Sequence, residues 1–232
     1  MPIEMYDLAA ADERVRFSPY CWRIRMALAH KGLETATIPW RFVEKEKIAF
    51  SSQGFVPVLV DGDRVVHDSW DIALYLDEAY ADRPALMEGA QARALTGFVR
   101  DWTQGAVHPV ILAAIMPDLF AALDERDKDY FRRTREQRFG KPLEQVGLPP
   151  ERARAELARS LAPARACLRD QAFLCGRSPG FADYVLFGPF QWARAVSRLE
   201  LLEENDALAA WLERMLDLFG GLARLAARTE PH

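Results

Sequence analysis

The 232-residue sequence predicts a fold class of α/β plus all-α, and three observations support this. Apolar strand patterns alternate with segments of helical period over residues 1–80. Within that region, Asp61-Gly62-Asp63 separates two short strand patterns and is typical of a hairpin turn. No segment after residue 80 has a clear strand pattern. We therefore expect a small α/β domain at 1–80, a linker at 81–90 and a helical-bundle domain at 91–232.

Composition and charge narrow the class of protein. Hydrophobic residues make up 50% of the chain, which is typical of a globular protein and argues against disorder. The net charge of -4 gives no basic surface of the kind that nucleic-acid binding needs. Three widely spaced cysteines predict no disulfide framework, and neither a signal peptide nor a membrane-spanning run is visible. We expect a soluble, cytoplasmic protein with no nucleic-acid partner, no membrane partner and no metal site.

The elements of the first 80 residues follow the order β-α-β-α-β-β-α. Ser18-Pro19 predicts the start of a helix, because serine is a good N-cap and proline suits the first helical position. Gly32, just after two cationic residues, predicts its end. The other elements are expected as strands at 4–8, 35–40, 56–60 and 64–67, a short exposed helix at 43–50 and a helix at 70–80.

Prolines divide the predicted helical domain. Pro109 and Pro117 should kink or end helices within residues 92–123, and Pro163 should kink a helix at 151–170. The segment 181–196 is the most apolar helical run, so we expect it at the buried centre of this half. Further helices are expected at 128–139 and 206–225, with a loop at 140–150.

The N-terminal end of the helix at Ser18 has two interpretations. As a plain cap, the serine oxygen accepts a backbone N–H bond that contributes about 1 kcal/mol. Alternatively, its hydroxyl donates to a ligand thiolate, and the helix dipole adds its positive end; both effects lower the pKa of a thiol. Several arginines near this end could attract an anionic ligand: Arg14, Arg16, Arg23 and Arg25.

Cys21 is expected to be a packing residue. It lies one turn into the same helix, on the apolar stripe that also carries Ile24 and Leu28. A C-x-x-C pair at a helix start would indicate disulfide exchange, but here Ser18 occupies the leading position. Dithiol redox catalysis is therefore disfavoured.

Two further sites follow in the α/β region. Val56-Pro57 precedes an apolar strand, either as a simple strand entry or as a cis turn that leaves the Val56 backbone free to pair with a peptide-like ligand. Asp68-Ser69 opens the next helix, either as a cap or as a site for an amino acid head group. In the second interpretation Ser69 holds the carboxylate and Asp68 the ammonium. The three sites together are more specific than any one alone.

In this order the sites resemble those of the glutathione transferase superfamily, and the helical half agrees through Phe181-Ala182-Asp183-Tyr184, which is similar to the family's capping motif. More narrowly, the chain resembles the serine-type class that contains bacterial β-aryl etherase homologues and enzymes of wood-degrading fungi. The resemblance rests on Ser18-Pro19-Tyr20-Cys21-Trp22, Val56-Pro57-Val58-Leu59-Val60, residues 68–76, Arg135-Glu136-Gln137 and Asp217-Leu218-Phe219.

The resemblance implies a thioredoxin-like domain that binds glutathione as co-substrate and a helical domain that lines an electrophile pocket. Ser18 would be the catalytic residue that activates the sulfur. Val56 would pair with the cysteinyl backbone beside a cis Pro57, and Asp68 with Ser69 would hold the γ-glutamyl end. The resemblance also implies a homodimer, in which the α/β half of one chain faces the helical half of its partner.

The chain departs from the family pattern at two positions. Phe55 stands where many relatives have a polar residue, and Gly180 stands where the helix cap is more often serine or threonine, although Asp183 can still bond back. Tyr6 is the rival catalytic residue, because some classes use a tyrosine after the first strand; we favour Ser18. For the glycyl carboxylate no single residue is predicted, and four remain open: Arg41, Lys45, Lys47 and Gln53.

The leading hypothesis is a glutathione transferase that attacks a hydrophobic, aromatic electrophile, by conjugation or by cleavage of an aryl ether. One alternative is a binding protein that carries glutathione or aromatic ligands with little catalysis, since a fold does not fix function. Another is glutathione-linked reduction through Cys21, which needs that thiol to be exposed. The expected pocket-lining residues of the helical half are Trp102, His108, Phe120 and Trp192.

Overall fold

The computed structural model describes residues 2–203 and 205–230. Its N-terminal part contains a four-stranded sheet in the order β2-β1-β3-β4. β1 (Ile3–Leu8) runs parallel to β2 (Thr35–Trp40) and antiparallel to β3 (Val58–Asp61), and β3 forms a hairpin with β4 (Arg64–His67). All four strands that the sequence predicts are present, and β2 and β4 have the predicted bounds.

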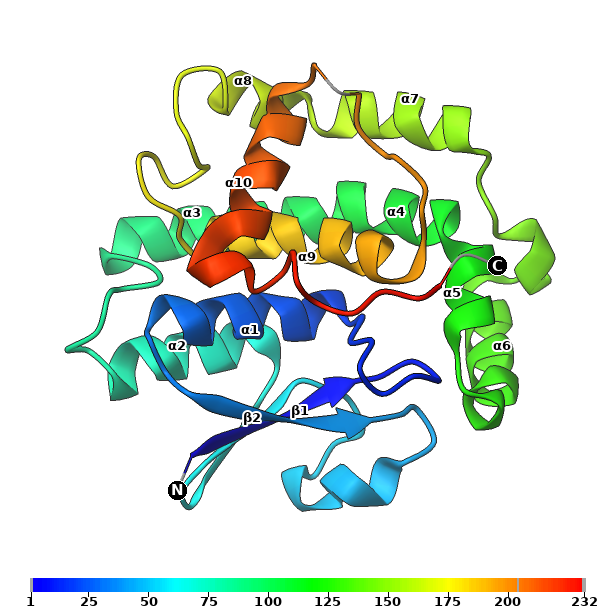
Figure 1. Cartoon of the computed structure of the whole chain (residues 1–232), viewed down its shortest axis with the longest axis horizontal. Coiled ribbons are helices and arrows are strands. Elements are labelled where there is room, and N and C mark those ends of the chain that lie inside the picture. Colours follow the sequence, from blue (N-terminus) through cyan, green and yellow to red (C-terminus); the bar gives the residue numbers. More distant parts are fainter. Residues whose placement is uncertain (1, 204, 231–232) are drawn as a thin grey trace.

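Two helices cover one face of this sheet. α1 (Pro19–His30) and α2 (Ser69–Ala79) lie between the sheet and the helical half of the molecule (Figure 1). α1 ends as predicted, with Gly32 at a φ of 64°, where a side chain would be unfavourable. The segment expected as an exposed helix at 43–50 is instead a 3₁₀ helix, η1 (Lys45–Ser51), that buries Ile48.

The second half of the described chain is helical, as predicted. α3 (Gly89–Trp102) continues through a π-helical turn, η2 (Thr103–Val107), into α4 (His108–Ala114), and α5 (Met116–Ala122) follows. Pro117 lies in the first turn of α5, where no intrahelical N–H bond is lost, whereas Pro109 directly follows the π-helical turn inside the continuous run Gly89–Ala114. The break between α4 and α5 therefore falls where Pro117 predicts it, and at Pro109 the helix continues with a local change to π-helical geometry.

The remaining peripheral helices differ in detail from the sequence expectation. α6 (Glu125–Phe139) is followed by a 3₁₀ turn, η3 (Leu143–Gln145). The single kinked helix expected at 151–170 is two helices, α7 (Pro150–Ser160) and α8 (Ala162–Cys167), that are separated at Leu161. α10 (Ala207–Gly221) leaves helical geometry at residues 218–220, where Phe219 has a φ of 54°.

α9 (Phe181–Val196) has the predicted bounds and lies at the centre of the helical half, against α1 (Figure 1). Almost all of its side chains are buried. Asp183 holds its N-terminus, because the carboxylate accepts from Gly180 N at 3.1 Å, Leu174 N at 2.7 Å and Trp211 Nε1 at 2.9 Å. Asp183 thus supplies the half of a capping box that bonds the N-cap backbone, while Gly180 has no side chain to supply the other half.

Within the described residues, no single helix combines the length and apolarity that a membrane span requires. One bent pair of helical segments, Gly89–Ala114 and Met116–Ala122, meets those criteria by length and composition alone, with an angle of 68° between its parts.

Candidate active site

Ser18 caps the N-terminus of α1 and lies at the junction of the two halves. Its extended backbone (φ -62°, ψ 123°) lets the hydroxyl oxygen accept from Cys21 N at 3.2 Å. The side chain is only 3% exposed, yet it lines a cavity. Because the backbone bond uses one lone pair, the hydroxyl hydrogen remains available to donate to a ligand.

The contact between α9 and the start of α1 fixes this end of the helix. Gly188 lies against the Pro19 carbonyl oxygen so closely that a Cβ there would overlap it. One turn further, Arg23 is buried with its guanidinium 4.7 Å from the centre of the Tyr20 ring. Burial lowers the pKa of Arg23 to about 10. The chain around Ser18 is therefore tightly packed against the helical half.

The cavity beside Ser18 is mostly apolar and measures about 160 Å³. Its walls come from both halves of the molecule. The lining residues are Leu8, Phe17, Ser18, Pro19, Tyr20, Trp40, Phe42, Phe55, Val56, His108, Leu112, Leu119, Phe131, Arg135, Arg138 and Trp192. We call this the apolar cavity.

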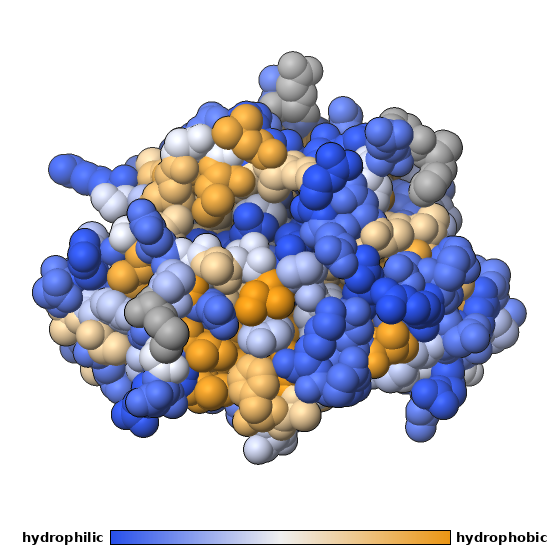
Figure 2. Space-filling view, turned by 60° about the horizontal axis from the view of Figure 1, so that its bottom comes forward, coloured by the Kyte–Doolittle hydropathy of each residue, from blue (hydrophilic) through white to orange (hydrophobic). Residues whose placement is uncertain are grey.

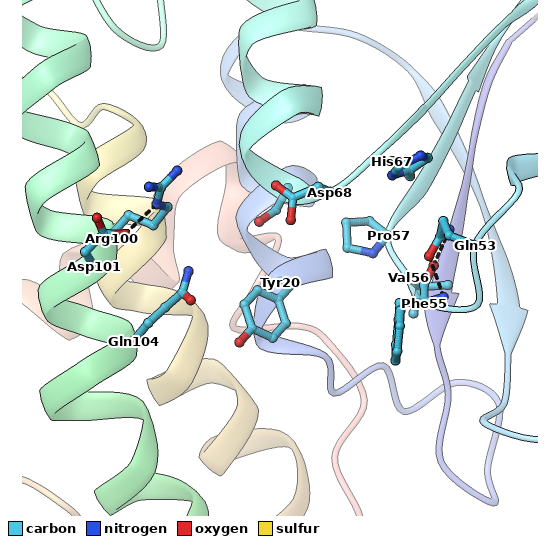
Figure 3. A pocket seen from close by; sticks show the side chains of 11 residues that line it. Tyr20, Gln53, Phe55, Val56, Pro57, His67, Asp68, Arg100, Asp101 and Gln104 are labelled. Carbon is cyan, nitrogen blue, oxygen red and sulfur yellow. Dashed lines mark hydrogen bonds and ion pairs between the residues drawn. The ribbon is translucent and has the colours of Figure 1, made fainter.

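A second, larger hollow of about 640 Å³ opens beside it. Figure 3 shows Pro57 and Asp68 on one side, with Arg100, Asp101 and Gln104 opposite. The lining residues are Tyr20, Gln53, Phe55, Val56, Pro57, His67, Asp68, Ser69, Arg100, Asp101 and Gln104. We call this the polar cleft.

Three residues belong to both walls: Tyr20, Phe55 and Val56. The peptide bond between Val56 and Pro57 is cis, which settles the isomer that the sequence left open. One ligand lying along Val56 can therefore reach both the polar cleft and the apolar cavity. The structure thus brings Ser18, Val56, Pro57, Asp68 and Ser69 around one continuous space.

Asp68 and Ser69 occupy the N-terminal end of α2. The Asp68 carboxylate accepts from Trp70 N at 2.7 Å, so the residue is a cap as well as a wall of the cleft. Its backbone has a φ of 66° and a ψ of 132°, an unfavourable region for a residue with a side chain. Such a conformation costs of order 1–3 kcal/mol and often marks a binding site.

Of the four residues left open for the glycyl carboxylate, only Gln53 lines the polar cleft. Its amide is folded onto neighbouring backbone, where Nε2 donates to Phe55 O at 2.9 Å. Arg41 is buried and pairs with Glu13 at 2.9 Å, and Lys47 pairs with Glu44 at 3.0 Å. The Lys45 ammonium donates to the Gly54 carbonyl. Of the four residues, Gln53 therefore has the position that best suits a contact with the glycyl carboxylate.

His108 lies deep in the apolar cavity, between Tyr20 and Trp192, with ring centroids 5.6 and 5.0 Å away. Burial and the neighbouring guanidinium groups of Arg23 and Arg138 lower the pKa of His108 to about 3. At neutral pH the imidazole is therefore uncharged. Its Nδ1 is buried and has no hydrogen-bond partner among the described residues.

Cys21 is fully buried and lines neither hollow. Burial raises the pKa of its thiol well above the usual range. Both observations fit the packing role predicted from its place on the apolar stripe of α1. They argue against the reductase alternative, which needs an exposed and reactive thiol.

Some sequence-based expectations for the pocket were wrong. His108 and Trp192 line the apolar cavity as expected, but Trp102 and Phe120 line neither hollow. The Phe120 ring instead packs on Phe131, 6.2 Å away. Tyr6, the rival catalytic residue, also lies outside both walls and packs on Phe50 at 5.5 Å.

Other wall residues were not predicted. His67, Arg100, Asp101 and Gln104 line the polar cleft, and Arg135 and Arg138 line the apolar cavity. For the last two, a signal was present in the sequence: Phe131, Arg135 and Arg138 follow the i, i+4, i+7 spacing of one helix face. Among the described residues, no cluster of three or more His, Cys, Asp or Glu side chains could hold a metal ion.

The fold and the paired hollows define a two-domain protein whose thioredoxin-like half presents a polar cleft and whose helical half completes an apolar cavity. Residues 17–79 match the family model described as glutathione S-transferase, N-terminal domain. Residues 94–219, more than half of the chain, match the model for the C-terminal domain. The chain therefore belongs to the glutathione S-transferase family.

Individual relatives agree with this assignment. Glutathione S-transferase Z1 of Arabidopsis thaliana is 40% identical over 78 residues, which are 32% of this chain and 35% of that protein. The first three curated relatives are matched over 35%, 44% and 47% of their own length, so the chain matches less than half of each.

Solved structures match over nearly the whole chain. Glutathione transferase GSTFuA3 from Phanerochaete chrysosporium has a TM-score of 0.82 at 28% identity, over 92% of this chain and 96% of that chain. A glutathione S-transferase of Ceriporiopsis subvermispora, solved in complex with glutathione, has a TM-score of 0.80 at 23% identity, over 94% and 96%. The resemblance to enzymes of wood-degrading fungi is therefore confirmed.

Proposed function

We propose that the chain is a glutathione transferase in which the Ser18 hydroxyl activates the glutathione thiol. One observation carries the proposal: the polar cleft and the apolar cavity share the wall formed by Tyr20, Phe55 and Val56. Ser18 lies in the apolar cavity beside that wall. A tripeptide held in the cleft would therefore present its central side chain at the serine.

In this proposal each part of glutathione has its own place. The cysteinyl backbone pairs with Val56 beside the cis Pro57. The γ-glutamyl end lies at Asp68 and Ser69, where the carboxylate of Asp68 meets the ammonium and the start of α2 meets the α-carboxylate. The Gln53 amide is the residue that we propose for the glycyl carboxylate, because it lines the same cleft.

The chemistry follows from the position of Ser18. Its hydroxyl oxygen already accepts from Cys21 N, so its hydrogen can donate to a thiolate. A hydrogen bond to a charged group is worth about 1.5–3 kcal/mol, and the end of α1 adds its partial positive charge. These terms lower the pKa of the bound thiol by about one to two units. The thiol proton is released to solvent.

The thiolate then attacks a hydrophobic electrophile in the apolar cavity. With an aryl halide, the carbon–sulfur bond forms as the carbon–halogen bond breaks, and the halide leaves with the bonding electron pair. With a β-aryl ether, the thiolate attacks the aliphatic β-carbon, the carbon–oxygen bond to the aryl group breaks, and a phenolate leaves with the bonding electron pair. The aromatic lining of the cavity supports an aromatic electrophile in both cases.

The two hollows also suggest a separate role for each half of the chain, and the exposed apolar residues suggest a homodimer. We assign glutathione binding to residues 1–80 and the electrophile wall to residues 91–232, and we propose a homodimer. Leu95 and Phe98 of α3 are 69% and 71% exposed. Phe55, which lines the polar cleft, is 70% exposed. Apolar side chains also gather in patches on the face shown in Figure 2. A second copy of this chain would cover such surface.

A cytoplasmic location is part of the proposal. All three cysteines, Cys21, Cys167 and Cys175, are free in the structure. A reducing compartment keeps such thiols from forming disulfides.

Glutathione titration and turnover together test the proposal. We expect saturable glutathione binding by calorimetry and turnover of an activated aryl halide or a β-aryl ether when glutathione is present. Binding of glutathione and of aromatic ligands without turnover of either electrophile would favour the carrier alternative. Failure to bind glutathione at all would contradict the proposed transferase.

A further inference from the structure

The wall of the apolar cavity carries an unbalanced positive charge. Among its sixteen lining residues are two arginines, Arg135 and Arg138, and no aspartate or glutamate. The rest of the wall is apolar or aromatic apart from Ser18 and the uncharged His108. Arg138 is exposed, whereas Arg135 is half-buried among aromatic rings, where its charge is costly to desolvate without an anion.

Arg135 lies among aromatic rings and has no carboxylate partner among the described residues. Its guanidinium lies 4.4 Å from the centre of the Phe131 ring and 5.3 Å from that of Phe42, and Nη1 donates to Thr134 Oγ1 at 3.0 Å. It forms no ion pair with a carboxylate among the described residues. The aromatic faces orient the guanidinium and partly offset its desolvation, while several N–H donors stay free.

The neighbouring arginine on the same helix behaves differently. Arg132 pairs with Glu136 at 3.3 Å and with Glu144 at 2.7 Å, on the outer side of α6. Asp127, the buried carboxylate of α6, accepts from Val43 N at 3.0 Å and does not line the cavity. These three carboxylates contact other groups, and within the part of the chain that the structure describes neither Arg135 nor Arg138 forms an ion pair.

We propose that the apolar cavity selects an aromatic ligand that carries a negative charge, a carboxylate or a phenolate, which Arg135 and Arg138 bind. The aromatic ring of such a ligand would pack on the apolar wall, and its anionic group would face α6. The planar guanidinium fork suits an oxygen anion well. This inference deepens the proposed function and rests on it for the identity of the reacting ligand.

Two electrophiles that differ only in charge give the first test. A chlorodinitrobenzoate and the matching chlorodinitrobenzamide, with the carboxylate or the amide para to the chlorine, react with glutathione in the same way. For Arg135→Gln we expect the kcat/KM of the benzoate to fall about tenfold, equal to about 1.4 kcal/mol, and that of the benzamide to change by less than about twofold. Arg138→Gln should act in the same direction.

A matched control lies on the same helix. Arg133 is exposed and lines neither hollow, so Arg133→Gln should leave both electrophiles unchanged. Because Arg135 packs on two rings, its replacement could disturb the fold. The exposed Arg138 carries less of that risk, and thermal unfolding of each variant separates lost stability from lost selectivity.

Binding without reaction gives the second test and separates this inference from the proposed function. Tryptophan fluorescence reports the Kd of a naphthoate and of the corresponding naphthamide. We expect the wild type to prefer the naphthoate and Arg135→Gln to lose that preference. This result would support the anion site even if neither electrophile were turned over. Equal affinity of the wild type for both ligands, or equal losses for both in the arginine variants, would overturn the inference.

Discussion

Gly188 in the middle of α9 lies directly against the carbonyl oxygen of Pro19, the first residue of α1. No side chain fits between them, so the two helices approach backbone to backbone. Since Ser18 immediately precedes Pro19, this contact fixes the position of the proposed catalytic hydroxyl relative to the helical half.

Gly188→Ala should therefore destabilise the protein. The added methyl group would overlap the Pro19 backbone, and overpacking of this kind costs about 1–3 kcal/mol. Gly105 is a matched control, because it lies in a helical segment where an added methyl group would have nothing within 4 Å. We expect thermal unfolding to show a lower Tm for Gly188→Ala and an unchanged or higher Tm for Gly105→Ala. Equal Tm values would show that the contact does not hold the halves together.

Asp68 should contribute its charge to glutathione binding. Asp68→Asn keeps an oxygen that can cap α2, but removes the negative charge that faces the proposed ammonium. We expect the KM for glutathione to rise about tenfold with little loss of stability, the effect of one charge-assisted bond. Asp71→Asn, an exposed change in the first turn of the same helix, should have no such effect. A similar rise in both variants would indicate a general electrostatic effect.

The lowered pKa of His108 predicts that the protein loses stability in acid. In the folded protein its pKa is about 3, whereas the unfolded chain takes up the proton near the ordinary histidine pKa of 6.5. Between these values the unfolded state binds more protons, so the contribution of His108 to stability falls as the pH falls. Urea unfolding should show that the free energy of unfolding of the wild type falls relative to that of His108→Gln as the pH is lowered from 6.5 toward 3. A difference independent of pH would mean that His108 has the same pKa in the folded and unfolded states, and would contradict its lowered pKa in the fold.

The exposed apolar residues of α3 predict the oligomeric state. Phe98→Glu should shift the protein from dimer to monomer in sedimentation, because it places a charge in the proposed interface. Leu225→Glu changes a residue that is 80% exposed near the C-terminus and serves as the control. A wild-type monomer, or a dimer that survives Phe98→Glu, would contradict the proposed interface.

The sequence predicted the fold best where the signals are local. The bounds of α9 and β2 and both ends of α1 were correct, because caps, proline and apolar period act within a few residues. Pro163 predicted an interruption of the helix at 151–170, but not the complete separation into two helices at Leu161, and the positive φ of Phe219 was missed. Both depend on packing between helices that no short segment reveals.

The candidate site also separates into features with local sequence signals and features that depend on packing between distant segments. Ser18 and the Asp68-Ser69 pair carry capping signals, so sequence could locate them, and the structure places them around one space. Which aromatic side chain faces that space depends on helix rotation, and Phe120 was wrongly expected there. The shared wall at Val56 could not be predicted either, because it requires Tyr20 of α1 to meet the separate segment Phe55-Val56.

The hydroxyl of Ser18 is the centre of the proposed mechanism, and the pKa of the bound glutathione thiol tests it most directly. The ultraviolet absorbance of the thiolate, followed against pH, gives that pKa in the wild type, in Ser18→Ala and in Ser18→Thr. We predict that Ser18→Ala raises it by about one to two units, while the loss of the cap costs about 1 kcal/mol of stability. Ser18→Thr, which keeps the hydroxyl, should stay close to the wild type. An unchanged thiol pKa and unchanged turnover in Ser18→Ala would contradict the proposed mechanism.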